Sequence, residues 1–166
     1  ESTVKIAQAG LPIVYAIIGG NPRYFKKLIQ AYREIGSEAG HANHELKVGA
    51  HSWGWIAEDG DQAVKDYFHP TKQVVDAISK DRPHWQELTY EQYLEQVGPN
   101  GAMFVGNPDQ VAEKLIRMIE DLDLDRFMLH LPLGSMPHDQ VLRAIELFST
   151  QVAPKIRAYF AMKEEL

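Results

Sequence analysis

A nearly unbroken apolar run, LPIVYAII, occupies Leu11–Ile18 and is bounded by Gly10 and by Gly19–Gly20. Continuous β-branched and aromatic residues are typical of a parallel strand that is buried on both faces, rather than one that is half exposed. The run therefore predicts a strand of a parallel sheet.

Two further segments have the character of strands. In residues 46–57, LKVGAHSWGWIA, small residues alternate with His51, Trp53 and Trp55, which is the period of two expected for a strand. Phe127–Leu133, FMLHLPL, forms the third run and ends near Pro132. The chain is thus predicted to contain three clear strands.

Helical spacing follows each predicted strand. Asn21–Pro22 and Asn107–Pro108 both read as helix starts, because Asn caps a helix and Pro fits its first position. Gln110 completes a capping box at the second of these. Helices are predicted at Glu1–Ala9, 22–39, 62–78, 108–122 and 137–160, the last with a kink or restart at Pro154.

Strands that alternate with helices indicate parallel βαβ units with right-handed crossovers. A complete (β/α)8 barrel takes about 250 residues, so a chain of 166 residues with three strands predicts part of a TIM barrel. A three-stranded doubly wound sheet is the alternative, although its two hydrophobic edges would be unpaired. We predict a single domain, 1–166, of three βα units, with an insertion near 79–101 that contains one short helix at Tyr90–Gln96.

Composition excludes several classes of protein. The chain has 17 Lys and Arg against 23 Asp and Glu, a net charge of −6, and lacks the basic face that nucleic acid or an anionic membrane requires. It contains no cysteine, which excludes disulfides, thiolate nucleophiles and cysteine-ligated metals and fits a cytoplasmic protein. No apolar run approaches the roughly 20 residues of a membrane helix. Because residue 1 is Glu, the chain is expected to be a processed form or a fragment.

Glycines after the first predicted strand suggest a phosphate site. Gly19 and Gly20 precede a helix start and Arg23, so backbone amides, the helix dipole and a guanidinium could all approach an anion. Ordinary turn chemistry before an Asn-Pro cap explains the same residues without a ligand. The local sequence alone favours the turn.

Histidines could bind metal, but their spacing does not favour it. His41 and His44 fall in a polar loop, and neither His-x-His nor His-Glu-x-x-His occurs. We therefore predict no metal site and interpret His51 and His130 as lining a pocket. A metal-dependent hydrolase that uses these two with His138 is a minor alternative.

Other catalytic motifs are missing from the sequence. No Gly-x-Ser-x-Gly, Gly-x-x-x-x-Gly-Lys or Gly-x-Gly-x-x-Gly occurs, so serine hydrolase, P-loop and Rossmann dinucleotide functions have no support. Trp53 and Trp55 share one face of their strand, where they either line a flat pocket or fill the core, and the core is favoured.

Seven segments in fixed order resemble the bacterial-luciferase-like, flavin-dependent monooxygenase family. The most specific are FVGNPDQVAEKL and the closing LF-x3-V-x-P-x-I. The segments are Glu-Ser at 1–2, AQAGLPIVYAIIGGNP (7–22), YREIGSEAGH (32–41), LKVGAHSWGWIAED (46–59), FVGNPDQVAEKL (104–115), LDRFMLHLPLGSMP (124–137) and VLRAIELFSTQVAPKIR (141–157).

The resemblance implies the C-terminal part of a TIM barrel, with its last three strands. It implies FMN, or alternatively a deazaflavin coenzyme, as cofactor, together with an unknown small-molecule substrate. The family's Gly-Gly-Thr-Pro-Glu-Ser phosphate motif is retained only as Glu1 and Ser2, with Thr3 beside them. Ser2 and Thr3, with Gly19 and Gly20, are therefore the expected phosphate contacts.

Much of the flavin pocket in this family comes from earlier strands, so the resemblance names no catalytic acid or base here. His51, Trp53 and His130 are expected to line the substrate pocket. The competing hypothesis is a non-catalytic half-barrel that associates with another copy of itself through its exposed strand edges. It predicts a homo-oligomer.

Overall fold

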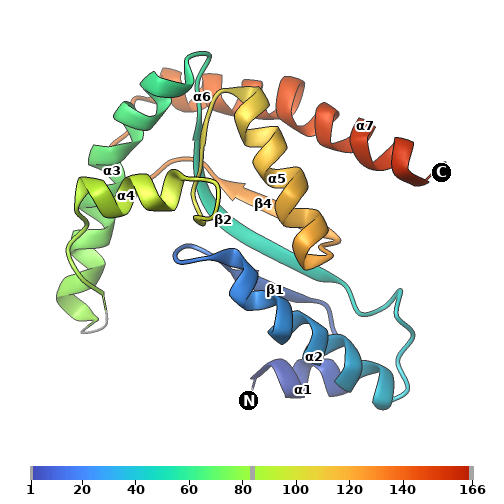
Figure 1. The fold of residues 1–166 in the computed structure, drawn as a ribbon. Coiled ribbons are helices and arrows are strands. Elements are labelled where there is room, and N and C mark those ends of the chain that lie inside the picture. The colour runs from blue at the N-terminus through green and yellow to red at the C-terminus, as the bar shows by residue number, and fades with distance from the viewer. Residues whose placement is uncertain (1, 83–84, 165–166) are drawn as a thin grey trace.

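The computed structural model describes residues 2–82 and 85–164, and in this part of the chain helices alternate with four parallel strands (Figure 1). The strands are β1 (Ile13–Ala16), β2 (Val48–Ile56), β3 (Phe104–Gly106) and β4 (Arg126–His130). The helical elements are α1 (Ser2–Gln8), η1 (Pro22–Phe25), α2 (Lys26–Glu38), α3 (Gly60–Asp81), α4 (Tyr90–Val97), α5 (Pro108–Leu122), α6 (His138–Leu147), η2 (Phe148–Val152) and α7 (Ala153–Glu164).

Strand β2 is the centre of the sheet. Residues 48–51 of β2 pair with β1, and residues 49–53 pair with β4. Since the same β2 residues bond to both neighbours, β1 and β4 lie on opposite edges of β2. The short strand β3 pairs only with the C-terminal residues 54–56. The order β1, β2, β4 therefore matches the three strands predicted from the sequence.

The count of three strands is wrong in one respect, because β3 is a fourth. The sequence predicts no strand before the helix start at Asn107–Pro108. A strand of three residues, all of them buried, is too short to show an alternating pattern. It pairs with residues 54–56 of β2, beyond the residues that pair with β1 and β4.

Helix boundaries follow the predicted starts more closely than the predicted ends. Asn107 caps α5 with the expected capping box, and α4 falls inside the predicted insertion. The predicted helix 137–160 is instead interrupted by η2, a π-helical segment. Pro154 has no N–H to donate to the carbonyl of Thr150, which explains the break. The predicted helix Glu1–Ala9 is confirmed from Ser2, and Glu1 lies outside the described residues.

The two faces of the sheet differ in how they are covered. One face carries Ile13, Tyr15, Val48 and Ala50, all buried. Helix α2 covers it at Tyr15, whose ring lies 5.7 Å from that of Phe25, the residue just before α2. Helix α5 contributes the buried face of its apolar stripe to the same core. Helices of this same chain therefore cover this face of the sheet.

The opposite face of the sheet is open over β1 and β4. The register places Val14 beside Gly49 and Arg126, and Ala16 beside His51 and Met128. Val14 is 52% exposed and Met128 38% exposed. In a complete barrel this face would line the interior.

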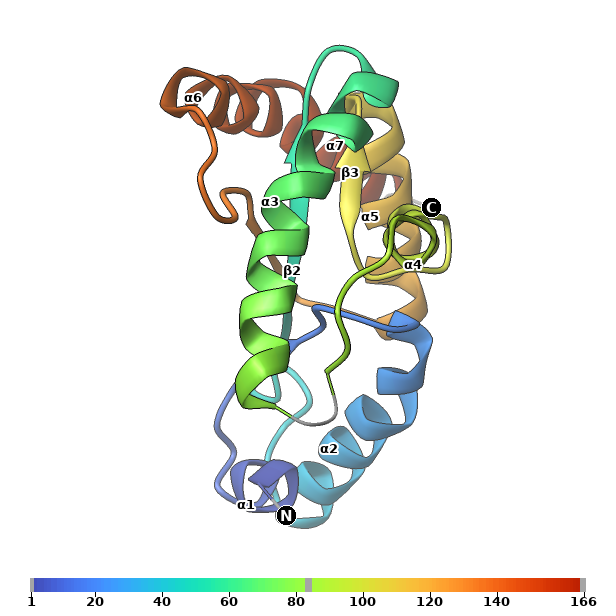
Figure 2. The same ribbon diagram turned by 90° about the vertical axis from the view of Figure 1, so that its left-hand side faces the viewer.

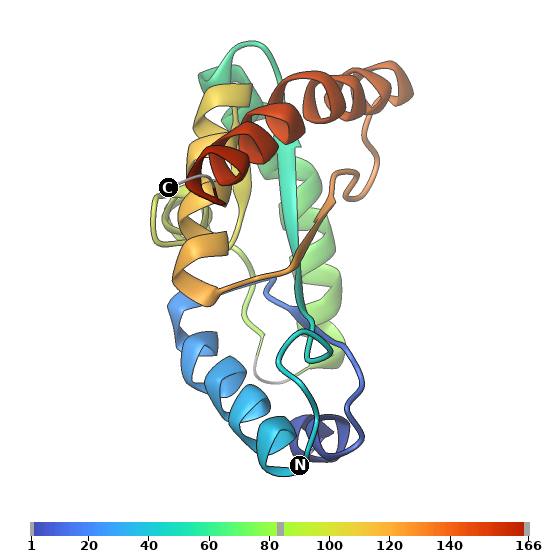
Figure 3. The same cartoon turned by 90° about the vertical axis from the view of Figure 1, so that its right-hand side faces the viewer.

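Helices α3 and α5 lie on opposite sides of β2 (Figures 2 and 3). Helices α6 and α7 come after β4, the last strand in the sequence. The loop after β4 packs against α3, because the Cα of Gly134 is close to Pro70 and Gln73. In residues 2–82 and 85–164, no helix is both long and apolar enough to cross a membrane.

Candidate functional site

The carboxyl ends of β1, β2 and β4 point the same way because the strands are parallel. Barrels and open α/β sheets bind their ligands at this end. The Gly19–Gly20 turn follows β1, and Trp53 and His130 are register partners near the ends of β2 and β4. The sheet thus places three of the sequence-predicted groups at one end.

Two hydrogen bonds hold the segment after β1 against β2. The Ile17 amide donates to the His51 carbonyl oxygen at 2.8 Å, and the buried Ser52 hydroxyl donates to the Ile17 carbonyl oxygen at 2.8 Å. Gly19 and Gly20 follow two residues after this anchored point. The position of this turn is therefore set by β2.

The Gly19–Gly20 turn presents its backbone to open space. A Cβ built on either glycine would meet no heavy atom within 4 Å, and Gly20 has a φ of +74°. Asn21 then caps η1, because its Oδ1 accepts from the Arg23 amide at 3.0 Å. Turn chemistry is present as predicted, and it leaves the backbone accessible to a ligand as well.

Ser2 and Thr3 form the first turn of α1, which packs against α2. Ser2 is exposed, and Thr3 lies beside the buried Tyr15, where burial raises and the Thr3 side chain lowers the pKa of the phenol, with a net rise. All three views show α1 at the lower end of the molecule and the turn after β1 above it (Figures 1–3). The four residues expected at a phosphate therefore form two separate groups.

His51 and His130 are neighbours on the open face. Their ring centroids are 5.5 Å apart, with the ring planes tilted by 37°. His51 is partly buried and His130 exposed. Burial, and then the charge of His130, lower the pKa of His51. The lowered pKa favours the uncharged imidazole, which can both donate and accept a hydrogen bond.

The tryptophans are in the core, as favoured from the sequence. Trp53 is 5% exposed, and the indole of Trp55 stacks on the ring of Tyr67 in α3 with centroids 5.9 Å apart and planes 7° apart. Helix α3 therefore covers the C-terminal end of β2. Because the Trp53 ring is almost fully packed, a ligand in a pocket could touch only its edge.

His41 and His138 have other surroundings than this pair. His41 Nε2 lies 2.9 Å from the Gln8 carbonyl oxygen, and His138 starts α6. No three His, Cys, Asp or Glu side chains form a group that could hold a metal ion within the described ranges.

Two features of the structure were not predicted from the sequence. The contact between His51 and His130 depends on the register of β2 and β4, which no local pattern reveals. Lys114 is the other, a buried lysine discussed below. Its signal was available, because it lies three residues after Val111 and four before Met118, on the apolar stripe of its helix.

Comparison with known proteins gives a match only at the level of structure. No family model matches the chain, and no curated protein matches it. The monooxygenase RslO1 from Streptomyces bottropensis superposes with a TM-score of 0.76 at 20% identity, over 92% of this chain and 44% of that one.

Two further similar structures are those of enzymes that use a flavin or a deazaflavin. The oxygenating constituent of 3,6-diketocamphane monooxygenase from Pseudomonas putida, in complex with FMN, gives a TM-score of 0.64 at 20% identity, over 93% of this chain and 45% of that one. The coenzyme F420 dependent tetrahydromethanopterin reductase from Methanopyrus kandleri gives 0.61 at 20% identity, over 93% and 48%.

The chain spans less than half the length of each of these structures. Identities of 20% establish the fold and not the activity. The chain thus shares the parallel α/β fold of these structures over less than half of their length, which agrees with the part of a TIM barrel that the sequence resemblance predicts.

Proposed function

We propose that this chain is part of a flavin-dependent oxidoreductase of the luciferase-like type, which uses reduced FMN or a deazaflavin on a small-molecule substrate. The observation that carries the proposal is the open Gly19–Gly20 turn at the carboxyl end of the sheet. It lies in a fold shared with a structure bound to FMN and with an F420-dependent reductase.

The turn fits a flavin phosphate on physical grounds. Nothing within 4 Å blocks either glycine, so a phosphate oxygen could reach the backbone amides. The turn is also fixed in place, since Ile17 is hydrogen bonded to two residues of β2. Accessible amides that follow an anchored segment are what an anion site requires. Ser2 and Thr3 are proposed as further phosphate contacts, which requires α1 to approach the turn.

His51 and His130 are proposed to face the substrate or the flavin ring from the open face. The flavin, when bound, would supply the redox chemistry. The protein would orient it, exclude water, and hold a proton on an imidazole at a defined place. Because burial lowers the pKa of His51 and so favours its uncharged ring, that ring can accept a proton from a reacting group without first losing one. Trp53 is proposed to close the floor of this pocket.

Titration of FMN with the purified chain, followed by quenching of flavin fluorescence, tests the proposal. Gly19→Asp places a carboxylate beside the proposed phosphate at a position with open space, so it should weaken FMN binding about tenfold or more. Gly19→Asn adds similar volume without charge and isolates the electrostatic part. Asn43→Asp, on a distant exposed loop, controls for net charge.

Riboflavin provides a second comparison, because it lacks the phosphate. Its binding should respond equally little to Gly19→Asp and to Asn43→Asp. Absence of saturable FMN quenching, or equal effects of the two aspartates on FMN, would contradict the proposal.

A half-barrel that associates with another copy is the second candidate. The observation that favours it is the open face, where Val14 and Met128 are exposed beside strands whose outer edges make no ladder with a described strand. Sedimentation velocity separates the candidates, because this one predicts a dimer or larger species and a monomer of 18.8 kDa would count against it.

A further inference from the structure

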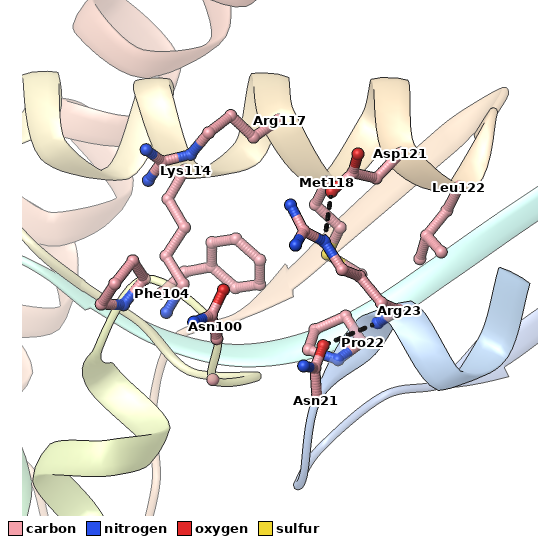
Figure 4. Close-up of a pocket in the computed structure, with 12 residues that line it drawn as sticks. Asn21, Pro22, Arg23, Asn100, Phe104, Lys114, Arg117, Met118, Asp121 and Leu122 are labelled. Atoms are coloured by element: carbon pink, nitrogen blue, oxygen red, sulfur yellow. Dashed lines mark hydrogen bonds and ion pairs between the residues drawn. The ribbon is translucent and has the colours of Figure 1, made fainter.

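A cleft of about 120 Å³ lies on the covered side of the sheet, between the start of η1, residues 99–101 and helix α5 (Figure 4). Its inner wall includes the ring of Phe104, which packs edge-on against Phe127 of β4 with centroids 5.1 Å apart. A single water needs only about 10–15 Å³, so the cleft has room for a small ion or group. It lies away from the His51–His130 pair, which is on the open face.

Hydrogen-bond donors dominate the walls of the cleft. Arg23 uses only its Nε, which donates to Asp121 at 2.9 Å, and both Nη atoms have no partner among the described residues. Arg117 uses one Nη for Glu113 at 3.2 Å. Figure 4 shows Asn100 between Arg23 and the end of Lys114. Its amide makes no hydrogen bond within the part of the chain that the structure describes.

Lys114 adds a buried amino group. Burial, and then the charge of Arg117, lower its pKa to about 7, so it carries only part of a positive charge near neutral pH. The residue is 9% exposed, and its Nζ donates to the carbonyl oxygens of Met103 at 2.6 Å, Gly98 at 2.7 Å and Val97 at 2.9 Å. No carboxylate of the described residues forms an ion pair with it. The amino group therefore fixes the loop that carries Asn100, while its partial charge remains uncompensated.

Two guanidinium groups, Arg23 and Arg117, and the partly protonated Lys114 thus line the cleft against one carboxylate, Asp121. Guanidinium groups bind phosphate oxygens with two parallel hydrogen bonds, and a buried charge nearby strengthens that attraction. We propose that this cleft binds a phosphate group, either free phosphate or the phosphate of a small molecule. In a chain with a net charge of −6, such a local excess of positive charge is not a general property of the surface.

The site is separate from the proposed flavin site and does not depend on it. The Gly19–Gly20 turn presents its backbone to open space, and neither glycine lines the cleft. The cleft begins with the next residue, Asn21, and is completed by α5. Phosphate should therefore bind with no flavin present, and saturating FMN should leave it bound.

The test is a titration of the 15N-labelled chain with inorganic phosphate, at ionic strength held constant with sodium chloride. Backbone amides of Asn21, Arg23 and Asn100 should shift and saturate, with a dissociation constant on the order of 1 mM. Glycerol 3-phosphate is titrated in parallel. Tighter binding of the ester identifies a phosphorylated small molecule as the ligand, and weaker binding of the ester identifies free phosphate.

The variant Arg23→Gln/Arg117→Gln should weaken phosphate binding about tenfold or more, since both side chains are exposed and neither supports the core. Arg157→Gln is the control, because Arg157 is also exposed but lies on α7 outside the cleft. Thermal melting verifies that each variant folds.

Three results would overturn the proposal. Shifts that stay linear with phosphate concentration, or equal losses in the Arg157→Gln control, would show only general ionic attraction. Displacement of phosphate by FMN would assign the cleft to the flavin's own phosphate.

Discussion

The two faces of the sheet differ in burial and in residue type although they share the same strands. Ile13 and Val14 are adjacent in β1, yet Ile13 is 8% exposed beneath the helices and Val14 is 52% exposed. The covered face carries large apolar side chains in one continuous core. The open face carries the histidine pair, Arg126 and Met128.

This difference separates residues that stabilise the fold from residues available for ligands. Burial of apolar area is the main favourable term in folding, so the covered face should carry most of the stability. The open face is where a barrel would enclose its ligand. Substitutions on the covered face should therefore mainly lower the free energy of unfolding. Substitutions on the open face should mainly weaken ligand binding.

The largest expected effect comes from β1. Ile13→Ala should lower the free energy of unfolding by about 3 kcal/mol, because it leaves a cavity in the core. Val14→Ala, one residue along, should change it by less than about 0.5 kcal/mol. Urea denaturation followed by circular dichroism measures both. Equal losses in the two variants would show that the faces do not differ as described.

Lys114→Met should cost about 2 kcal/mol in the same assay, since it removes the donor to several buried carbonyl oxygens at the end of α4. Lys26→Met is the matched control on the exposed surface of α2 and should have almost no effect. A stable Lys114→Met variant would mean that the carbonyl groups find other partners.

Ser52→Ala should cost about 1 kcal/mol, because the buried hydroxyl donates to the Ile17 carbonyl oxygen. It should also raise the rate of amide hydrogen exchange at Ile17 and in the Gly19–Gly20 turn. Ser37→Ala, exposed on α2, is the control. Unchanged exchange at the turn would show that β2 does not position it.

The smallest effect concerns pH. The folded-state pKa of His51 lies below 6.5, so the unfolded chain binds a proton more readily than the folded one. The free energy of unfolding should therefore fall as pH drops below about 6.5. His51→Gln should flatten this decline, whereas His44→Gln, in an exposed loop, should not. Urea denaturation at pH 5 and pH 7 measures this decline in the unmodified chain and in both variants. An equal loss of free energy of unfolding between pH 7 and pH 5 in all three would contradict the prediction.

Much of the fold was predictable because its signals are local. Asn-Pro starts at Asn21 and Asn107 fix two helix beginnings, and the apolar run at 11–18 gives β1. Strand β3 was not predictable in this way, because three residues carry no period. The sequence predicted the helix break at Pro154. The irregular segment η2 instead lies in the turn before it, because Pro154 lacks the N–H that would bond back into that turn.

The candidate site was predictable in its parts and not in its assembly. His51 and His130 were named from their positions in strands, but their contact depends on pairing between segments that are far apart in sequence. Ser2 and Thr3 were grouped with the Gly19–Gly20 turn by resemblance alone, and their common contact with a phosphate stays a prediction. The cationic cleft combines η1 with α5, which only tertiary structure brings together.

The histidine ring signals in 1H–15N spectra, recorded during a titration with FMN, test the central claim most directly. If the open face holds the flavin, the ring nitrogens of His51 and His130 should shift together and saturate with FMN. Those of His44 and His69, outside the site, should stay unchanged. Saturable FMN binding without any shift at His51 and His130 would contradict the account.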